Sequence, residues 1–448
     1  MKTFKQHLLF LENLKGFKMT KFFPLREKPA PSPYKKGDVL VLFGELFSRG
    51  YANGLVEEAE RIGMTIVRAT VGRREKDGNL RALNAEETAS IPQPFINIPL
   101  EAGFDMEPAK NGVTPCDQLK DLKMSDWDQA KLDWQAIDES QASGVARFRK
   151  NTEAFLKELE QHIPAGANVL FAHLMAGGVP RTKIIMPLLN RAFKGTGDRH
   201  IPTQSLLDSE IGQFCLRNFN EVTAETFNHL LDLSTPLRKK LESQGSHVSY
   251  TAYGYHGTEV LINGDYKWQT YTCYFQGWAK MALEKVSENF SAKGVNTCVY
   301  NCPEILTNSS SVFQGVEMSL YPLLEALTKD APHKEKAQTI LNQCKELLKD
   351  EVTFDEIKTF INAYLTNPLT LEFTSYEKWP QHSRKDQMEY MLGSSDHLFE
   401  MHKDSKNLIT AVLSEVVFNS CGYIMLHDSW SPKAPAAWIG HDIVARCV

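Results

Sequence analysis

The chain has 448 residues, of which 42% are hydrophobic and 23% are charged, as expected for a globular protein with a large buried core. Its 50 basic and 55 acidic side chains give a net charge of −5, so the total charge favours neither nucleic acid nor an anionic membrane as a partner. The eight cysteines lack CxxC spacing and any paired Cys/His pattern, which argues against a structural zinc site or a disulfide framework.

Residues 1–36 are predicted to form an N-terminal extension whose native start is Met1 or Met19. Prolines between positions 24 and 33 give its second half an extended character. The first fifteen residues are interrupted by Glu12 and Lys15 and lack a cleavage site, so they make a poor signal peptide. No apolar run approaches the length that spans a bilayer. We therefore expect a cytoplasmic protein without a membrane span.

Residues 37–330 alternate between short apolar runs and segments with helical periodicity. Strands are predicted at 38–44, 64–71, 94–99, 167–173, 246–252 and 294–300, and helices at 55–62, 144–162, 207–243 and 276–293. This alternation predicts an α/β fold with a doubly wound parallel sheet of the Rossmann type. A polar, partly helical insertion is expected at 102–143. Residues 331–448 are predicted to be a mixed, largely helical extension of unknown role.

A glycine-containing turn follows the first predicted strand. Gly44, Gly50 and Gly54 lie between this strand and the first helix, where a backbone without side chains can approach the pyrophosphate of a dinucleotide. The spacing differs from GxGxxG, so the glycines could also serve only the turn. Gly177, after the strand at 167–173, is a second candidate for cofactor contact.

Two further segments bear on the cofactor. Arg73 and Arg74 follow the second strand, where an acidic residue would bind a ribose hydroxyl and an arginine can hold a 2′-phosphate. Because no Asp or Glu precedes Glu75 there, the sequence favours NADPH, with NADH as the alternative. Solvated surface arginines explain the pair nearly as well. Thr307, after the strand at 294–300, is a candidate contact for the nicotinamide carboxamide.

The candidate catalytic residues cluster around the strand at 246–252 and the helix that follows it. Tyr271 and Lys280 place a phenol and an ammonium close together, and a nearby ammonium makes it easier for a phenol to donate a proton. Tyr255 lies at the end of the strand, where side chains face the ligand crevice. Tyr274 is a rival phenol, and core packing is the ordinary alternative for all three tyrosines.

These motifs resemble the short-chain dehydrogenase/reductase superfamily, and within it the FabV-type enoyl-acyl-carrier-protein reductases and the trans-2-enoyl-CoA reductases. The spacing Tyr271-x8-Lys280 is similar to theirs, and three other stretches resemble their AYSYxG, SPRRT and VTQASS segments. These stretches are Ala252-Tyr-Gly-Tyr255-His-Gly, Val179-Pro-Arg-Thr182 and Leu306-Thr-Asn-Ser-Ser-Ser. The glycine loop departs from the FabV-type GxSxGYG pattern. The resemblance covers residues 37–325 in patches.

The resemblance implies an NAD(P)H-dependent oxidoreductase that reduces the 2,3 double bond of an enoyl thioester in fatty-acid metabolism, without a metal. Its substrate would be carried by CoA or by acyl-carrier protein. Tyr271 or Tyr255 would protonate the enolate, and Lys280 would hold the nicotinamide ribose. Two alternatives remain: a short-chain-type keto or hydroxy oxidoreductase, and a regulatory protein that binds NADPH without catalysis. Gln276 stands where the superfamily's usual tyrosine would be, which speaks against the first alternative.

Overall fold

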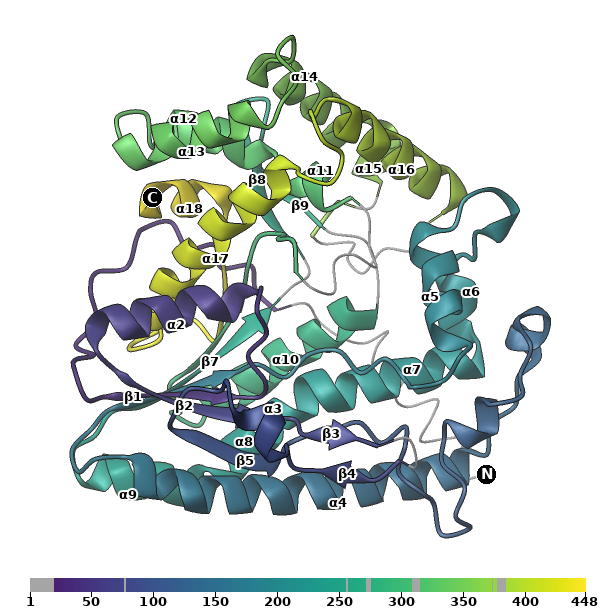
Figure 1. Cartoon of the computed structure of the whole chain (residues 1–448), viewed down its shortest axis with the longest axis vertical. Coiled ribbons are helices and arrows are strands. Elements are labelled where there is room, and N and C mark those ends of the chain that lie inside the picture. The colour runs from purple at the N-terminus through teal and green to yellow at the C-terminus, as the bar shows by residue number, and fades with distance from the viewer. Residues whose placement is uncertain are drawn as a thin grey trace.

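The structure is a computed structural model that describes residues 20–75, 78–254, 257–270, 275–307, 315–372, 374–376 and 384–448. Its centre is a parallel sheet of seven strands with helices on both faces (Figure 1). The strands, in order across the sheet, are β11 (Ala436–Trp438), β10 (Thr297–Asn301), β7 (Val248–Gly254), β6 (Val169–His173), β1 (Val39–Phe43), β2 (Thr65–Thr70) and β5 (Phe95–Pro99). This arrangement confirms the predicted doubly wound Rossmann-type fold.

The strand order identifies where a ligand belongs. β1 pairs with β2 on one side and with β6 on the other, so the chain reverses its direction of travel across the sheet between β1 and β6. In open α/β sheets, ligands bind at the carboxyl ends of the strands beside such a reversal. The candidate glycines at 44 and 177 follow β1 and β6, so both lie at this edge.

One face of the sheet is covered by helices from the middle of the chain. Their apolar side chains form a core with Val39, Val41 and Phe43 of β1. The helices are α4 (Trp134–Leu159), α8 (Thr226–Leu233), α9 (Thr235–Ser243) and α10 (Phe275–Ser291). A separate cluster of buried apolar side chains joins the 102–143 region to α5 (Ile185–Lys194), α6 (Thr203–Asp208) and α7 (Glu210–Asn220).

The opposite face is covered by α2 (Tyr51–Ile62) together with helices from the C-terminal third of the chain. The latter are α11 (Val316–Leu320), α12 (Pro322–Asp330), α13 (Glu335–Glu346), α14 (Phe354–Leu365), α16 (Lys385–Glu400), α17 (Ile409–Asp428) and α18 (His441–Cys447). α15 (Pro368–Leu371) lies before α16. Residues 331–448 therefore supply a strand of the main sheet and share its core, although the sequence set them apart as an extension.

α17 packs directly against α2, and two glycines make this possible. A Cβ on Gly54 would lie 2.0 Å from the carbonyl oxygen of Phe418, and a Cβ on Gly422 would lie 2.0 Å from the carbonyl carbon of Gly54. α17 is 20 residues long and, by length and composition alone, apolar enough to cross a membrane. It differs in this from the expectation that no apolar run is long enough, and 67% of its most apolar stretch is buried inside the protein.

Residues 20–25 extend the sheet beyond β11. The backbone N–H of Leu25 donates to the carbonyl of Trp438 (2.8 Å), and the N–H of Trp438 donates to the carbonyl of Phe23 (3.0 Å). Pro24 and Trp438 form a parallel bridge. The rings of Phe22, Trp268 and Tyr376 pack around Trp438 at this edge. The second half of the N-terminal extension is therefore tied to the core of the protein.

Several elements differ from the sequence-based expectation. α4 begins at Trp134, ten residues before the predicted helix, because the side chain of Asp133 caps it by accepting from the N–H of Ala136 (3.1 Å). An antiparallel hairpin of β8 (Thr258–Ile262) and β9 (Asp265–Gln269) follows β7, where no strand was predicted. α7 continues into a π-helical turn at Glu221–Glu225.

The remaining short elements lie mainly in the region between β2 and α4. They are β3 (Arg73–Arg74), β4 (Leu80–Arg81), α3 (Ala85–Thr88) and the 3-10 turns at Asp117–Leu119, Met124–Gln129, Glu160–His162 and Gly197–Arg199. The predicted 102–143 insertion thus contains two 3-10 turns before α4 starts.

Candidate active site

The first βα loop leaves the backbone open at the carboxyl edge of the sheet. Gly44 follows β1 with φ 131°, a conformation that only glycine adopts readily, and a Cβ there would lie 3.1 Å from Cβ of Leu174. At Gly50, which precedes α2, a Cβ would meet no atom within 4 Å. The N-terminus of α2 has no side-chain cap and lies beside this loop, where the positive end of a helix dipole favours an anionic group. This geometry fits a dinucleotide pyrophosphate.

Gly54 and the two arginines have other partners in the structure. Gly54 serves the close contact between α2 and α17, whatever else it does. Arg74 is almost fully buried, and its guanidinium binds the carboxylates of Glu101 (2.8 Å) and Glu107. Arg73 is 41% exposed and pairs with Glu45. The roles of Gly54, Arg73 and Arg74 in cofactor binding stay predictions.

The loop that follows β6 is held by side chains from two helices. The N–H of Gly177 donates to Oε1 of Gln276 (3.1 Å), and its carbonyl accepts from Oγ1 of Thr223 (3.1 Å). Nε2 of Gln276 donates to the same Thr223 hydroxyl (3.4 Å), so each of the three residues is hydrogen-bonded to the other two. Asn218 donates to the carbonyl of Gly178 (2.7 Å). We call Gly177, Thr223 and Gln276 the loop clamp.

The loop clamp depends on two unusual backbone features. Gly177 has φ 99°, and a Cβ there would meet no atom within 4 Å, so the outer side of the loop is open. Thr223 lies in the π-helical turn that follows α7, and such turns occur frequently at functional sites. Sequence reasoning noted Gln276 only as the absence of a tyrosine and missed Thr223 altogether. A π-helical turn leaves no clear signal in a sequence.

Lys280 lies in α10, one turn after Gln276, and its side chain is buried. Its Nζ donates to the carbonyl of Tyr253 (2.5 Å), next to the last residue of β7. Burial lowers the pKa of Lys280 to about 8. Lys280 also contributes to lowering the pKa of His173, at the end of β6, although burial is the larger cause. α10 thus places an ammonium at the carboxyl ends of the central strands.

The ring of Tyr253 links β7 to the start of α2. It stacks on the ring of Tyr51 with 5.7 Å between centroids, and the Tyr51 hydroxyl donates to the carbonyl of Pro303 (2.6 Å). Burial raises the pKa of Tyr253 well above its ordinary value, and its hydroxyl has no hydrogen-bond partner within the described part of the chain. These contacts hold the ends of β7 and β10 beside α2.

The three candidate phenols, Tyr255, Tyr271 and Tyr274, lie outside the described residues. Their distance from Lys280 therefore stays a prediction. Thr307 is the last described residue of the segment that follows β10. This segment is tied to α17, because the N–H of Leu306 donates to Oγ of Ser414 (2.8 Å). The contact of Thr307 with the nicotinamide carboxamide likewise stays a prediction.

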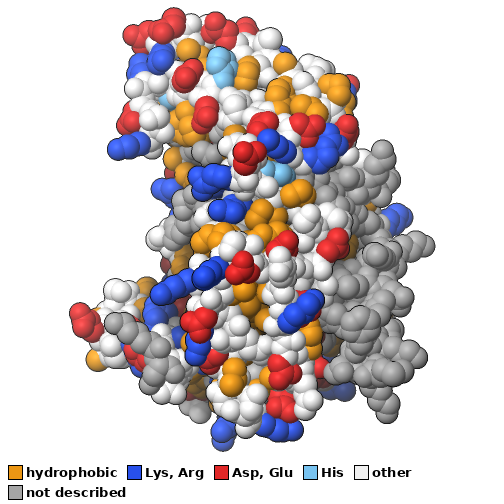
Figure 2. Space-filling view, turned by 90° about the vertical axis from the view of Figure 1, so that its right-hand side faces the viewer, with side chains coloured by type: hydrophobic (Ala, Val, Ile, Leu, Met, Phe, Trp, Pro, Cys, Tyr) orange, Lys and Arg blue, Asp and Glu red, His pale blue; other side chains and the backbone are white. Residues whose placement is uncertain are grey.

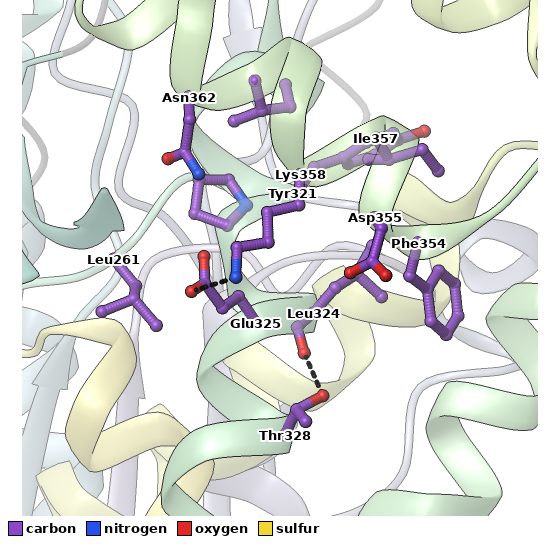
Figure 3. A pocket seen from close by; sticks show the side chains of 12 residues that line it. Leu261, Tyr321, Leu324, Glu325, Thr328, Phe354, Asp355, Ile357, Lys358 and Asn362 are labelled. Atoms are coloured by element: carbon purple, nitrogen blue, oxygen red, sulfur yellow. Dashed lines mark hydrogen bonds and ion pairs between the residues drawn. The ribbon is translucent and has the colours of Figure 1, made fainter. Parts of the chain in front are cut away.

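A separate pocket lies between β8, α12 and α14 (Figure 3). It has a volume of about 100 Å³, and apolar side chains such as Leu261, Ile357 and Phe354 line it. Lys358 and Glu325 form an ion pair of 2.9 Å between α14 and α12 (Figure 3). None of the candidate site residues lines it. The candidate active site is the carboxyl edge of the sheet, and this pocket is not part of it.

Comparisons with known proteins identify the family to which the chain belongs. The model of the family described as enoyl-acyl carrier protein reductase FabMG matches residues 21–448. A solved structure described as the apo structure of FabMG is 45% identical, covers 96% of this chain and 98% of its own, and has a TM-score of 0.92. A structure described as NADH-bound FabMG is 39% identical over the same shares of the two chains, with a TM-score of 0.77. No curated protein sequence matches the chain.

The family match confirms the predicted enoyl reductase and refines the branch, because the sequence motifs pointed to the FabV type. Neither the keto or hydroxy oxidoreductase nor the regulatory protein without catalysis finds support among these matches. The chain belongs to the FabMG family of enoyl-acyl carrier protein reductases.

Proposed function

We propose that the chain reduces the 2,3 double bond of an enoyl-acyl carrier protein with NADH, in the synthesis of fatty acids. The observation that carries the proposal is the buried Lys280 ammonium at the carboxyl end of β7, where it donates to the carbonyl of Tyr253, whose ring stacks on Tyr51 at the start of α2. The family match supports the thioester substrate, and the NADH-bound relative supports the cofactor.

NADH, when bound, would supply the hydride that adds to the β-carbon of the thioester. The electrons of the double bond then move to the carbonyl oxygen, and a proton must reach the resulting enolate. Tyr271 or Tyr255 is the proposed donor. The Lys280 ammonium keeps the potential positive at this point, which stabilises the developing negative charge and assists a neighbouring phenol. The predicted cytoplasmic location fits such an enzyme and stays a prediction.

The surface around α5 suits an anionic carrier. Residues 179–202 contain five Lys or Arg residues and one acidic residue, although the whole chain has a net charge of −5. Arg181 already pairs with Glu101 and Asp105, so the other four carry the excess, and Met186 adds exposed apolar surface at 36%. Figure 2 looks onto the side that carries α5 and α6, where Lys and Arg side chains lie among Asp and Glu side chains. Such a local excess of cations attracts an anionic partner despite the negative total charge.

A direct assay tests the proposed function. The purified chain is mixed with NADH and a crotonyl thioester of either acyl-carrier protein or CoA, and absorbance is followed at the nicotinamide band. We expect turnover with the enoyl thioester, faster on the carrier protein, and none with a 3-ketoacyl thioester. Cofactor binding without turnover on either enoyl thioester would contradict the proposal and favour a regulatory role.

The loop clamp gives a second expectation. Gln276→Leu removes both hydrogen bonds of this side chain. The backbone N–H of Gly177 then loses its partner, while its carbonyl still accepts from Thr223. A lost hydrogen bond of this kind corresponds to about 1 kcal/mol. We expect KM for NADH to rise about fivefold while kcat changes less. Gln338→Leu, on an exposed part of α13, is the matched control. An unchanged KM in a folded Gln276→Leu variant would remove the clamp from cofactor binding.

A further inference from the structure

A carboxylate from the first βα loop lies over the end of the second strand. Glu45 follows Gly44, directly after β1, yet its Oε2 accepts a hydrogen bond from Oγ1 of Thr70 (3.2 Å). Thr70 is the last residue of β2 and is buried. The glutamate side chain therefore reaches across from one strand to its neighbour.

This position is where dinucleotide-binding sheets place the adenosine ribose. In such sheets, a carboxylate at the end of the second strand accepts hydrogen bonds from the ribose hydroxyls of NAD, and an arginine there accommodates the 2′-phosphate of NADP. The segment from Thr70 to Arg74 contains no acidic residue. Glu45 supplies the missing carboxylate from the loop after β1 instead.

Neither nearby arginine is left for a phosphate. Arg73 donates from both terminal nitrogens to the two oxygens of Glu45, at 3.0 and 3.1 Å. This bidentate geometry is strong and directional. The Arg74 guanidinium is only 8% exposed and is already bound by Glu101 and Glu107. The Glu45–Arg73 pair keeps partial access to solvent, with side chains 19% and 41% exposed.

We infer that Glu45 selects NADH over NADPH by accepting a hydrogen bond from the 2′-hydroxyl of the ribose and by holding Arg73 in an ion pair. A 2′-phosphate carries a charge of about −1.5 to −2 near neutral pH. It would stand beside the Glu45 carboxylate and would have to break the pair with Arg73. A hydroxyl, in contrast, can donate to Glu45. The inference rests on the proposed function and reverses the preference for NADPH expected from Arg73 and Arg74.

Binding of the two cofactors to Glu45→Gln tests the inference without requiring turnover. Dissociation constants for NADH and NADPH are measured by fluorescence titration of the free protein. Wild type should bind NADH more tightly. In Glu45→Gln the ratio of the NADPH to the NADH dissociation constant should fall about tenfold or more, since charge-assisted hydrogen bonds of this type correspond to about 1.5–3 kcal/mol. The double variant with Arg73→Gln should lose the gain in NADPH binding.

The controls separate this inference from the proposed function. Glu75→Gln removes one negative charge from the same segment, where Glu75 pairs with Arg81, and it should leave the ratio unchanged. Thermal melting shows whether each variant is folded. If Glu45→Gln does not fold, Arg73→Gln takes its place in the test, and it should still bind NADH because Glu45 remains. A wild type that prefers NADPH, or a folded Glu45→Gln with an unchanged ratio, overturns the inference alone. Wild type that binds neither dinucleotide overturns the proposed function with it.

Discussion

Replacing Lys280 by Met is expected to lower kcat/KM for the enoyl thioester about a hundredfold or more. Met has a similar length and keeps the buried space filled, so the change removes mainly the ammonium that donates to the carbonyl of Tyr253. A preorganised donor at a site of developing negative charge contributes about 3 kcal/mol where this has been measured. The rate is followed by the oxidation of NADH, and the melting temperature shows whether the fold is kept.

The pH profile separates a catalytic role of Lys280 from a structural one. Since burial lowers the pKa of Lys280 to about 8, the ammonium predominates below that pH and is lost above it. Wild-type kcat/KM should therefore decline as the pH rises through about 8, and Lys280→Met should lack this decline. Lys285→Met, on the same helix and paired with Glu288, should behave like wild type. A wild-type rate that stays level across this range would contradict the role of the ammonium.

Gly54→Ala should destabilise the protein by about 3 kcal/mol or more. The added Cβ would lie 2.0 Å from the carbonyl oxygen of Phe418, so α2 and α17 would have to move apart. Forcing extra atoms into a well-packed contact typically costs about 1–3 kcal/mol, and here the obstacle is backbone on both sides. The shift is measured as a lower urea midpoint by circular dichroism.

Gly393→Ala is the matched control for Gly54→Ala. Gly393 also lies inside a helix, α16, but a Cβ there would meet no atom within 4 Å. Alanine in an unobstructed helix position is favoured over glycine by about 0.5–1 kcal/mol. The control should therefore unfold at the same or a slightly higher urea concentration. Equal midpoints for the two variants would show that α2 and α17 tolerate the extra atom.

The sheet was predictable because its strands carry a strong local signal. The apolar runs of β1 and β6 are buried on both faces, and the alternation of such runs with helical segments indicated the fold class. The β8–β9 hairpin also had a signal that was overlooked. Asn263 and Gly264 both have positive φ between the two strands, and Asn-Gly is the commonest pair in such turns.

The site could be predicted only where chemistry and chain position coincide. Lys280 follows directly from its place on the helix after β7. Glu45, in contrast, meets Thr70 across 25 positions, and Thr223 meets Gly177 across 46. Such contacts depend on how separate elements pack, which no local pattern records. The partners of Arg74 could not be predicted for the same reason, because Glu101 and Glu107 lie beyond β5.

The pairing of residues 20–25 with Trp438 and the packing of α17 on α2 have a consequence for biosynthesis. While the ribosome is still translating the last forty residues, α2 has no covering helix and the sheet lacks its outermost strand. The apolar side chains of α2 and of the sheet face beneath it then stay exposed to solvent until the final segment has been synthesised. A nonsense codon anywhere before position 438 would consequently yield a product that cannot close its own core, and such a product would be a substrate for chaperones and proteases.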